Sequence, residues 1–194
     1  LTAVVPLQRS IVTGQAGSNA DVALEIAAPS GAVKGSAAGR SLPLFGLFRL
    51  DAADADGRPA IVAAGDRVTV RSGEASIADS VPALSILGDA DLDGVTGTAP
   101  PGAAVTVTVQ SGLGLDAASR GAVAGGSGRF TIGFGGAYDI DGFTTLRVDL
   151  VRGAFTFRAE RLQSEQLMIR FYANTVGGLS VPGTPMAVEL TRRE

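Results

Sequence analysis

Three aspartates at alternate positions form the most specific candidate for chemistry in this sequence. Asp89, Asp91 and Asp93 precede Gly94, which is the D-x-D-x-D-G spacing that opens a calcium-binding loop. Alternate carboxylates of such a loop converge on the cation, and the glycine permits a sharp turn. Pro100 stands where the bidentate glutamate of the loop belongs. Two alternatives stay open: a weak extracellular Ca²⁺ site at a junction between modules, or an aspartate-rich linker that keeps strand edges soluble.

Two further segments, residues 51–57 and 139–142, carry the same residue types in a weaker pattern, and each ends in Asp-Gly. An Asp-Gly pair between apolar runs is a strong signal for a tight turn. We therefore interpret both segments as turns rather than metal sites. The glycine-rich segment 121–128 lacks the Gly-Lys-Ser/Thr ending of a phosphate-binding loop, so we interpret it as a loop between strands.

The residue types needed for covalent or acid–base catalysis are scarce. The sequence has no His and no Cys, which excludes Ser-His-Asp sites, Cys-His sites and cysteine-based zinc sites. Lys34, the one lysine, could act as a base for a nearby serine, but in its Gly/Ser/Ala surroundings we favour a solvated cation. A glycosidase needs two facing carboxylates, and the glutamates form no pair motif: Glu25, Glu74, Glu160, Glu165, Glu189 and Glu194. We predict no catalytic residue, no cofactor apart from the candidate Ca²⁺, and no enzyme activity.

Charge and hydropathy exclude two classes of partner. The chain of 194 residues carries 16 Lys plus Arg against 19 Asp plus Glu, a formal net charge of −3. Such a balance leaves no broad basic face for nucleic acid. Every apolar run is interrupted well before the roughly 18 residues that a membrane-spanning helix needs. We expect neither a nucleic-acid partner nor a membrane span.

The elements that must position these residues are strands. Apolar residues alternate with more polar ones, so that each strand has one apolar face, along segments 22–26, 105–109, 146–150 and 167–171. The 27 Gly and nine Pro lie mostly between such segments, as turn residues do. We find no convincing helix, and the alternation is typical of antiparallel sheets. The predicted fold class is all-β.

An internal repeat divides the chain. Val12-Thr-Gly-Gln-Ala recurs as Val95-Thr-Gly-Thr-Ala, and Gly46-Leu-Phe-Arg-Leu recurs as Gly128-Arg-Phe-Thr-Ile. A period of roughly 80–85 residues with several short strands in each unit indicates tandem β-sandwiches rather than a solenoid, whose units are shorter. We predict a first module over residues 1–87 and a second over 88–194, with the boundary near residues 86–94.

Both ends of the chain exceed the repeat. Residues 1–8 are predicted to be a connector or edge strand, and no charge precedes Arg9 to blunt an unpaired edge. The second copy adds segments 167–173 and 186–190, which we predict as extra strands. Such ends suit pairing with a neighbouring molecule, so we expect a homo-oligomer, a filament-like assembly or a larger surface complex. The alternative is that both ends fold back onto their own sheets.

The repeat resembles known modules. Residues 95–109, followed by Gly-Ser-Gly-Arg-Phe-Thr-Ile at 126–132, resemble tandem immunoglobulin-like modules of bacterial secreted and cell-surface proteins. They are also similar to carboxypeptidase-regulatory-like and fibronectin-III-like sandwiches. The resemblance extends over residues 8–162 and implies two tandem immunoglobulin-like antiparallel β-sandwiches, located outside the cell or on its surface. It implies adhesion, spacing or assembly, and no shared catalytic residues.

Aromatic residues bear on the alternatives for function. Six phenylalanines fall on strand phases and are predicted to be core residues: Phe45, Phe48, Phe130, Phe134, Phe155 and Phe157. The chain has no Trp, which disfavours a carbohydrate-binding face. We therefore predict a non-enzymatic extracellular structural protein, a building block or spacer-adhesin of a cell-surface or filamentous assembly with protein partners. The alternative is a polysaccharide-binding accessory module of a larger secreted enzyme.

Overall fold

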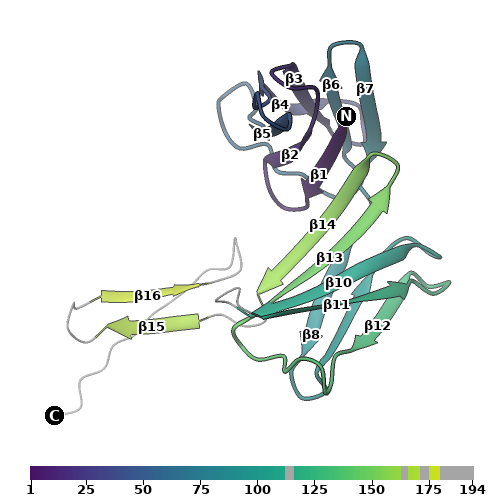
Figure 1. The fold of residues 1–194 in the computed structure, drawn as a ribbon, viewed down its shortest axis with the longest axis vertical. Helices are drawn as coiled ribbons and strands as arrows, with labels where there is room; N and C mark the ends of the chain where they lie inside the picture. The colour runs from purple at the N-terminus through teal and green to yellow at the C-terminus, as the bar shows by residue number, and fades with distance from the viewer. Residues whose placement is uncertain (112–115, 163–165, 171–174, 180–194) are drawn as a thin grey trace.

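The computed structural model describes residues 1–111, 116–162, 166–170 and 175–179, and every regular element within these ranges is a β-strand. Figure 1 shows two modules arranged end to end. The all-β prediction is confirmed. No helix long and apolar enough to cross a membrane occurs among the described residues.

The first module is a sandwich of two antiparallel sheets. One contains three of its strands, in the order β1 (Thr2–Pro6), β2 (Ile11–Gln15) and β5 (Leu47–Asp51). The other contains four, in the order β4 (Val33–Arg40), β3 (Asp21–Ala27), β6 (Arg67–Ser72) and β7 (Ala75–Ser80). Along β3 the side chains of Val22, Leu24 and Ile26 are buried, and the residues between them are more exposed. This alternation packs one apolar face of each sheet against the other, as in immunoglobulin-like sandwiches.

The second module repeats this arrangement. Its three-stranded sheet has the order β12 (Arg129–Gly133), β9 (Gly94–Thr98) and β8 (Ser85–Asp89). Its four other strands have the order β11 (Ala117–Val123), β10 (Ala104–Ser111), β13 (Thr144–Arg152) and β14 (Phe155–Leu162). A separate hairpin follows, formed by β15 (Gln166–Arg170) and β16 (Thr175–Leu179). Residues 167–170 of the first predicted extra strand are thus in β15, whereas residues 171–173 and the predicted strand at 186–190 lie outside the described residues.

The sequence repeat corresponds to equivalent turns in the two modules. The backbone N–H of Ala16 donates to the carbonyl oxygen of Gly46, and that of Ala99 donates to Gly128, both at 2.9 Å. The two glycines have φ values of 63° and 76°, a conformation that glycine adopts without strain. The turn before β5 and the turn before β12 are therefore structurally equivalent. The predicted tandem repeat is confirmed.

One sheet runs through both modules. β1 pairs with β2 on one side, and on its other side it pairs in parallel with β14, with Ala3 opposite Phe155 and Pro6 opposite Arg158. The result is a seven-stranded sheet in the order β11-β10-β13-β14-β1-β2-β5. β1 is thus an interior strand of this sheet, and for this end of the chain the structure shows the fold-back alternative.

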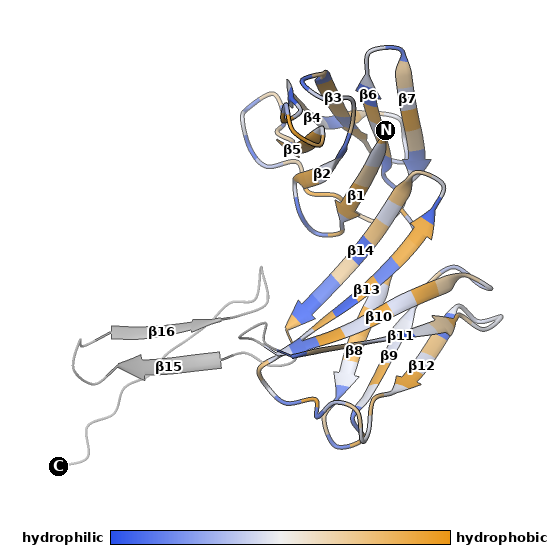
Figure 2. Cartoon of the chain, viewed as in Figure 1, coloured by the Kyte–Doolittle hydropathy of each residue, from blue (hydrophilic) through white to orange (hydrophobic). Residues whose placement is uncertain are grey.

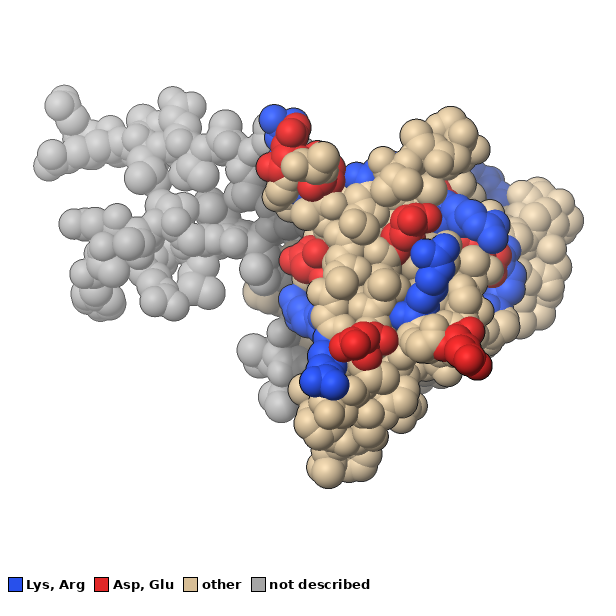
Figure 3. All heavy atoms as spheres, turned by 90° about the horizontal axis from the view of Figure 1, so that it is seen from above, with Lys and Arg blue, Asp and Glu red and all other residues tan. Residues whose placement is uncertain are grey.

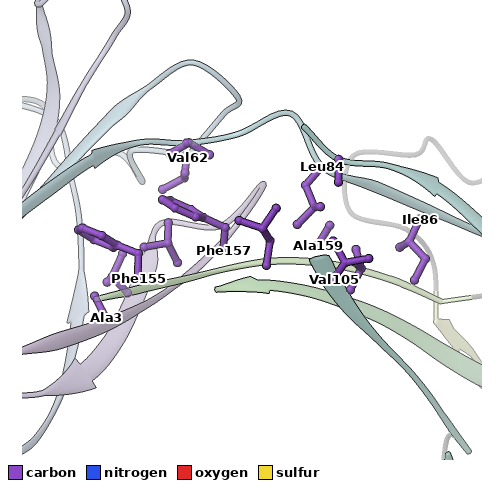
Figure 4. Close-up of a cluster of buried hydrophobic side chains, with 14 of the residues drawn as sticks. Ala3, Val62, Leu84, Ile86, Val105, Phe155, Phe157 and Ala159 are labelled. Atoms are coloured by element: carbon purple, nitrogen blue, oxygen red, sulfur yellow. The ribbon is translucent and has the colours of Figure 1, made fainter. Parts of the chain in front are cut away.

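The hydrophobic core is continuous across the junction. Buried side chains follow β14 from Phe155 beside Ala3, through Phe157 below Val62, to Ala159 between Leu84 and Val105 (Figure 4). Figure 2 shows that β14 is more apolar where it runs beside β1 and more polar at its far end. Phe155 and Phe157 therefore belong to the contact between the modules as well as to the core.

The passage between the modules is short. Residues 86–94, where the sequence places the boundary, form most of the β8–β9 hairpin, in which Ile86 opposes Gly97 and Asp89 opposes Gly94. The chain crosses from β7 to β8 through residues 81–84, of which Val81 and Leu84 are buried. In this structure the crossing segment is part of the core.

The core prediction for the phenylalanines is correct for five of them and wrong for Phe45. Phe48, Phe130, Phe134 and the two on β14 are buried, but Phe45 is 70% exposed. Phe45 lies in the loop before β5 with a φ of 68° and is followed by Gly46 at 63°. Two successive left-handed residues break the strand phase, so the alternation counted through Phe45 does not continue there.

Candidate functional site

The calcium-loop candidate lies in the β8–β9 turn, and its carboxylates accept hydrogen bonds from backbone amides. The Oδ1 atom of Asp89 accepts from the N–H groups of Asp91 at 3.1 Å and Leu92 at 3.2 Å. Asp93 has a φ of 45°, and its Oδ1 accepts from the N–H of Ile140 at 3.0 Å. Asp89 therefore closes the turn, and Asp93 joins this turn to the loop that precedes β13.

These three aspartates are not assembled into a ligand set. Within the described ranges, no group of three or more acidic side chains is placed to hold a metal ion. Asp91 takes part through its backbone amide, which donates to Asp89. The arrangement supports a structural role for Asp89, Asp91 and Asp93 in the turn.

The two other acidic segments form side-chain-capped turns. The Oδ1 atom of Asp54 accepts from the N–H groups of Asp56 and Arg58, both at 2.9 Å. The Oδ1 atom of Asp141 accepts from the N–H of Phe143 and the hydroxyl of Thr144, also at 2.9 Å. Both segments are turns, as predicted.

The glycine-rich segment 121–128 ends β11 and forms the turn before β12. The N–H of Gly125 donates to the carbonyl of Arg129, and the N–H of Gly128 donates to the carbonyl of Gly125, each at 2.8 Å. The segment therefore closes on itself as a loop between strands, in agreement with the prediction.

Lys34 forms an ion pair with a buried carboxylate. Its Nζ lies 2.6 Å from Oδ2 of Asp66 and donates to the carbonyl of Ile61 at 2.8 Å. Asp66 is 2% exposed, and its Oδ2 also accepts from the N–H of Ala63 at 2.8 Å. The expectation of a solvated cation is wrong, because this pair ties β4 to the loop before β6. No serine is bonded to Lys34 in the described part of the chain, which leaves no base–nucleophile pair there.

The environment of one phenol, at the far end of the second module, raises its pKa. Burial raises the pKa of Tyr138 above 10.0, and the carboxylates of Asp141, Asp116 and Asp139 act in the same direction, whereas a hydrogen bond with Thr144 acts against it. A phenol with a raised pKa stays protonated at neutral pH. Tyr138 therefore offers no base for catalysis.

A shallow depression lies on the outer face of the four-stranded sheet. It has a volume of about 620 Å³ and is lined by residues of β3, β4 and the β6–β7 hairpin, including Asp21, Arg40 and Arg71. Its lining contains no aromatic side chain, so it offers no ring on which a sugar could stack. Figure 3 shows positive and negative side chains interspersed on the face seen from above, rather than a field of one sign.

The junction between the modules holds the most specific set of contacts. Beyond the ladder, the N–H of Ala3 donates to Ala154 at 3.0 Å and the N–H of Leu7 donates to Arg158 at 2.7 Å. Arg152, at the tip of the β13–β14 hairpin, reaches the first module, where its Nε donates to Oδ2 of Asp79 at 2.6 Å. Its Nη2 donates to the carbonyl of Ser80.

Two arginines hold the β13–β14 hairpin together and connect it to its surroundings. The guanidinium of Arg152 lies over the ring of Phe157, 5.2 Å from its centroid, which is the geometry of a cation–π contact. Arg158 makes a two-pronged contact with Asp149 of β13, at 2.7 and 3.0 Å. The hydrogen bond to Asp149 raises the pKa of Arg158, and burial opposes it. The Arg158 pair therefore joins β14 to β13, and Arg152 joins the β13–β14 hairpin to the first module.

Sequence reasoning predicted the strands of the junction but missed their pairing with each other and the role of Arg152. The only local signal is Arg152-Gly153, which marks a turn between two alternating segments. Alternation indicates that a segment is a strand, but it does not name the strand's neighbour.

No family model and no curated protein matches this sequence. Among solved structures, the chain is similar to the tetra-tandem repeat in the extending region of a large adhesion protein, at 18% identity and a TM-score of 0.35, over 89% of this chain and 46% of that one. It is similar to the BSP domain of a biofilm-associated protein, at 14% identity and 0.27, over 82% and 28%. It is also similar to a pullulanase of Group B Streptococcus, at 7% identity and 0.29, over 80% and 22%.

The chain spans less than half the length of each of these three structures. The similarity is distant, and it is to immunoglobulin-like β-sandwich repeat domains, which include modules of bacterial surface adhesins. The sheets of the chain itself define its class, a tandem β-sandwich of all-β structure.

Proposed function

We propose that this chain is a non-enzymatic spacer or building block of an extracellular surface assembly. The observation that carries the proposal is the junction, where β1 of the first module is an interior strand between β2 and β14. Domains joined only by a linker move relative to each other by default. Here a backbone ladder, a shared core and the Arg152–Asp79 pair connect the modules. Two modules joined in this way keep a fixed distance between their ends, which a spacer requires.

The polar groups of the described residues support a structural role. The carboxylates of Asp89 and Asp141 cap turns, and that of Asp93 bonds the backbone of a distant loop. Those of Asp66 and Asp149 are bonded to cations. Groups committed to such contacts are not available to bind a substrate without breaking them. These carboxylates therefore hold loops and strands in position.

The test is the location of the protein on intact cells. Immunogold labelling of unpermeabilised source cells, with permeabilised cells as the control, reports whether the chain is displayed outside. We expect label on the envelope, on surface appendages or on shed material. Label found only after permeabilisation would overturn the proposal.

A retention assay distinguishes the proposed function from the polysaccharide-binding alternative. The purified chain is passed over insoluble glycans, with a carbohydrate-binding module of known affinity as the positive control. We expect the chain to elute in the void, because the depression on the four-stranded sheet has no aromatic lining. Retention that soluble glycan releases would favour the accessory-module function instead.

A further inference from the structure

The internal junction pairs the outer edge of the first strand of one module, β1, with the outer edge of the last sandwich strand of the other, β14. Each module has both a first strand and a last strand, so each has one edge of each kind. The first kind is the outer edge of β1. In the ladder with β2, Ala3 of β1 opposes Gly14, and in the ladder with β9, Ile86 of β8 opposes Gly97. Because both glycines occupy the same position of the repeat, β8 is the equivalent of β1.

The second kind is the outer edge of β14. Arg152 opposes Phe155 across a turn in which Gly153 has a φ of 58°. Ser72 opposes Ala75 across the β6–β7 turn, where the glycine has a φ of 56°. β7 is therefore the equivalent of β14, with Ala75 in the position of Phe155.

The two equivalent edges are unpaired in the described chain. β8 ends the three-stranded sheet and β7 ends the four-stranded one, so each has a neighbour on one side only. In the part of the chain that the structure describes, the edge that β1 and β14 use is thus paired once, at the junction, and is open once, at β8 and β7. Leu87 of β8 is 50% exposed, whereas Val4, its equivalent on β1, is half-buried beside Thr156.

Neither open edge carries the usual protection against pairing. Natural edge strands are blunted by charges, prolines or bulges. Both β7 and β8 lack proline, and their ladders run in continuous register. The one charged residue of β8 is Asp89, at its end, and that of β7 is Asp79, which Arg152 already binds. A neighbouring strand could therefore approach Ala75–Ala78 of β7 and Ser85–Gly88 of β8.

We propose that β8 of one copy pairs in parallel with β7 of a second copy, which repeats between molecules the contact that β1 and β14 make within one. This inference rests on the proposed function and names a second copy of the chain as the partner. In the equivalent register Leu87 faces Ser76, as Val4 faces Thr156. The contact uses two different surfaces of each molecule, so it is a head-to-tail contact and not a symmetric pair. Repeated without closing into a ring, it extends into a filament.

The contact between molecules is weaker than the internal one. The internal ladder buries Phe155 and Phe157, whereas Ala75 and Ile77 hold the equivalent positions on β7. Less apolar surface is removed from water, so the affinity is lower. A weak contact of this kind is effective where copies are held close together, as on a surface or in a growing filament.

Disulfide trapping tests the contact, and the absence of cysteine from the chain makes the readout unambiguous. Full-length Leu87→Cys and Ser76→Cys variants are mixed and oxidised mildly, and the products are identified by peptide mass spectrometry. Because directly paired strand residues have Cβ atoms within reach of a disulfide, we expect a 76–87 cross-link between chains. The control replaces Leu87→Cys with Val123→Cys, another exposed apolar residue on an edge strand.

The expected result is a 76–87 product formed roughly tenfold faster than the 76–123 control product, because pairing raises the effective concentration of the two thiols. The double variant Leu87→Cys/Ser76→Cys should then form a ladder of covalent oligomers. Equal rates for the two mixtures, or a dominant 87–87 product, would overturn the inference. The trapping experiment tests only the contact between copies, whereas surface labelling tests the proposed function. A failure of one is therefore distinguishable from a failure of the other.

Discussion

The ring of Phe130 occupies the space in which a side chain at Gly97 would lie. A Cβ atom built on Gly97 would be 2.8 Å from Cε1 of Phe130, and closer still to Cζ and to the carbonyl oxygen of Ser85. Phe130 and Gly97 are direct partners in the β9–β12 ladder. The first module has the same arrangement, with Phe48 opposite Gly14. The Gly and Phe of the sequence repeat are thus one packing unit on two neighbouring strands.

The first prediction is that Gly97→Ala destabilises the protein by about 2–3 kcal/mol, because the added methyl has to displace a buried ring and a backbone carbonyl. Gly133→Ala, on the adjacent strand β12, is the control, since a Cβ there meets nothing within 4 Å. Urea unfolding of both variants measures the difference. Similar midpoints for the two variants would contradict the packing explanation.

The second prediction concerns the pair that connects the modules. Arg152→Ala removes the bond to Asp79 and the contact with Phe157, and we expect a loss of about 1 kcal/mol, since both charged side chains are partly exposed. Calorimetry should also show a less cooperative transition, because the first and second modules lose a shared contact. Arg58→Ala, which breaks the exposed pair with Asp56, should have little effect. An equal effect of the two variants would mean that the Arg152 contact does not stabilise the junction.

The third prediction assigns Asp93 a structural role. Asp93→Ala removes the acceptor for the N–H of Ile140 and places alanine at a φ of 45°, so we expect a loss of about 2 kcal/mol. Asp93→Asn keeps an acceptor and tolerates this backbone conformation, so it should restore most of the stability. Thermal unfolding of both variants gives the comparison. If Asp93→Asn were as unstable as Asp93→Ala, the negative charge rather than the hydrogen bond would be responsible.

The fourth prediction is that Ca²⁺ has no effect on stability. Asp89 and Asp93 already bond backbone amides, so a cation would have to replace those bonds. We expect the same melting temperature in EDTA and at about 5 mM Ca²⁺, a concentration that would saturate a weak extracellular site. If Ca²⁺ raised the melting temperature of the wild type and Asp91→Ala abolished this rise, the calcium-site interpretation would be correct.

The fifth prediction is a late titration of Tyr138. Its folded pKa is raised above 10.0, mainly by burial, so its contribution to stability is complete below that value and is lost as the pH rises through the folded pKa. The phenolate absorbance of wild type minus that of Tyr138→Phe should therefore have its midpoint above pH 10. Unfolding in urea should return the midpoint to the ordinary value. A midpoint at or below pH 10 in the folded protein would contradict the burial of this phenol.

The sequence predicts the strands and the repeat because both leave local signals. Alternation marks β3, β10 and β13, and the recurring Val-Thr-Gly marks β2 and β9. The partner of β1 leaves no such signal, since pairing with β14 depends on where the whole second module folds. The role of Asp93 is hidden for the same reason, because its partner Ile140 is far along the chain. Lys34 was misjudged because its small neighbours suggest solvent, while Asp66 approaches from another loop.

The parallel direction of β1 and β14 has a mechanical consequence. Tension along the chain enters β1 at its N-terminal end and leaves β14 at its C-terminal end, so the two strands are pulled in opposite directions along their length. The hydrogen bonds between them are then loaded in shear and share the load, whereas a hairpin pulled apart from its open end breaks one bond at a time. Rupture of the ladder requires several bonds to fail together, while Phe155 and Phe157 leave the core. The strand pair that joins the modules is thereby also the element that resists stretching.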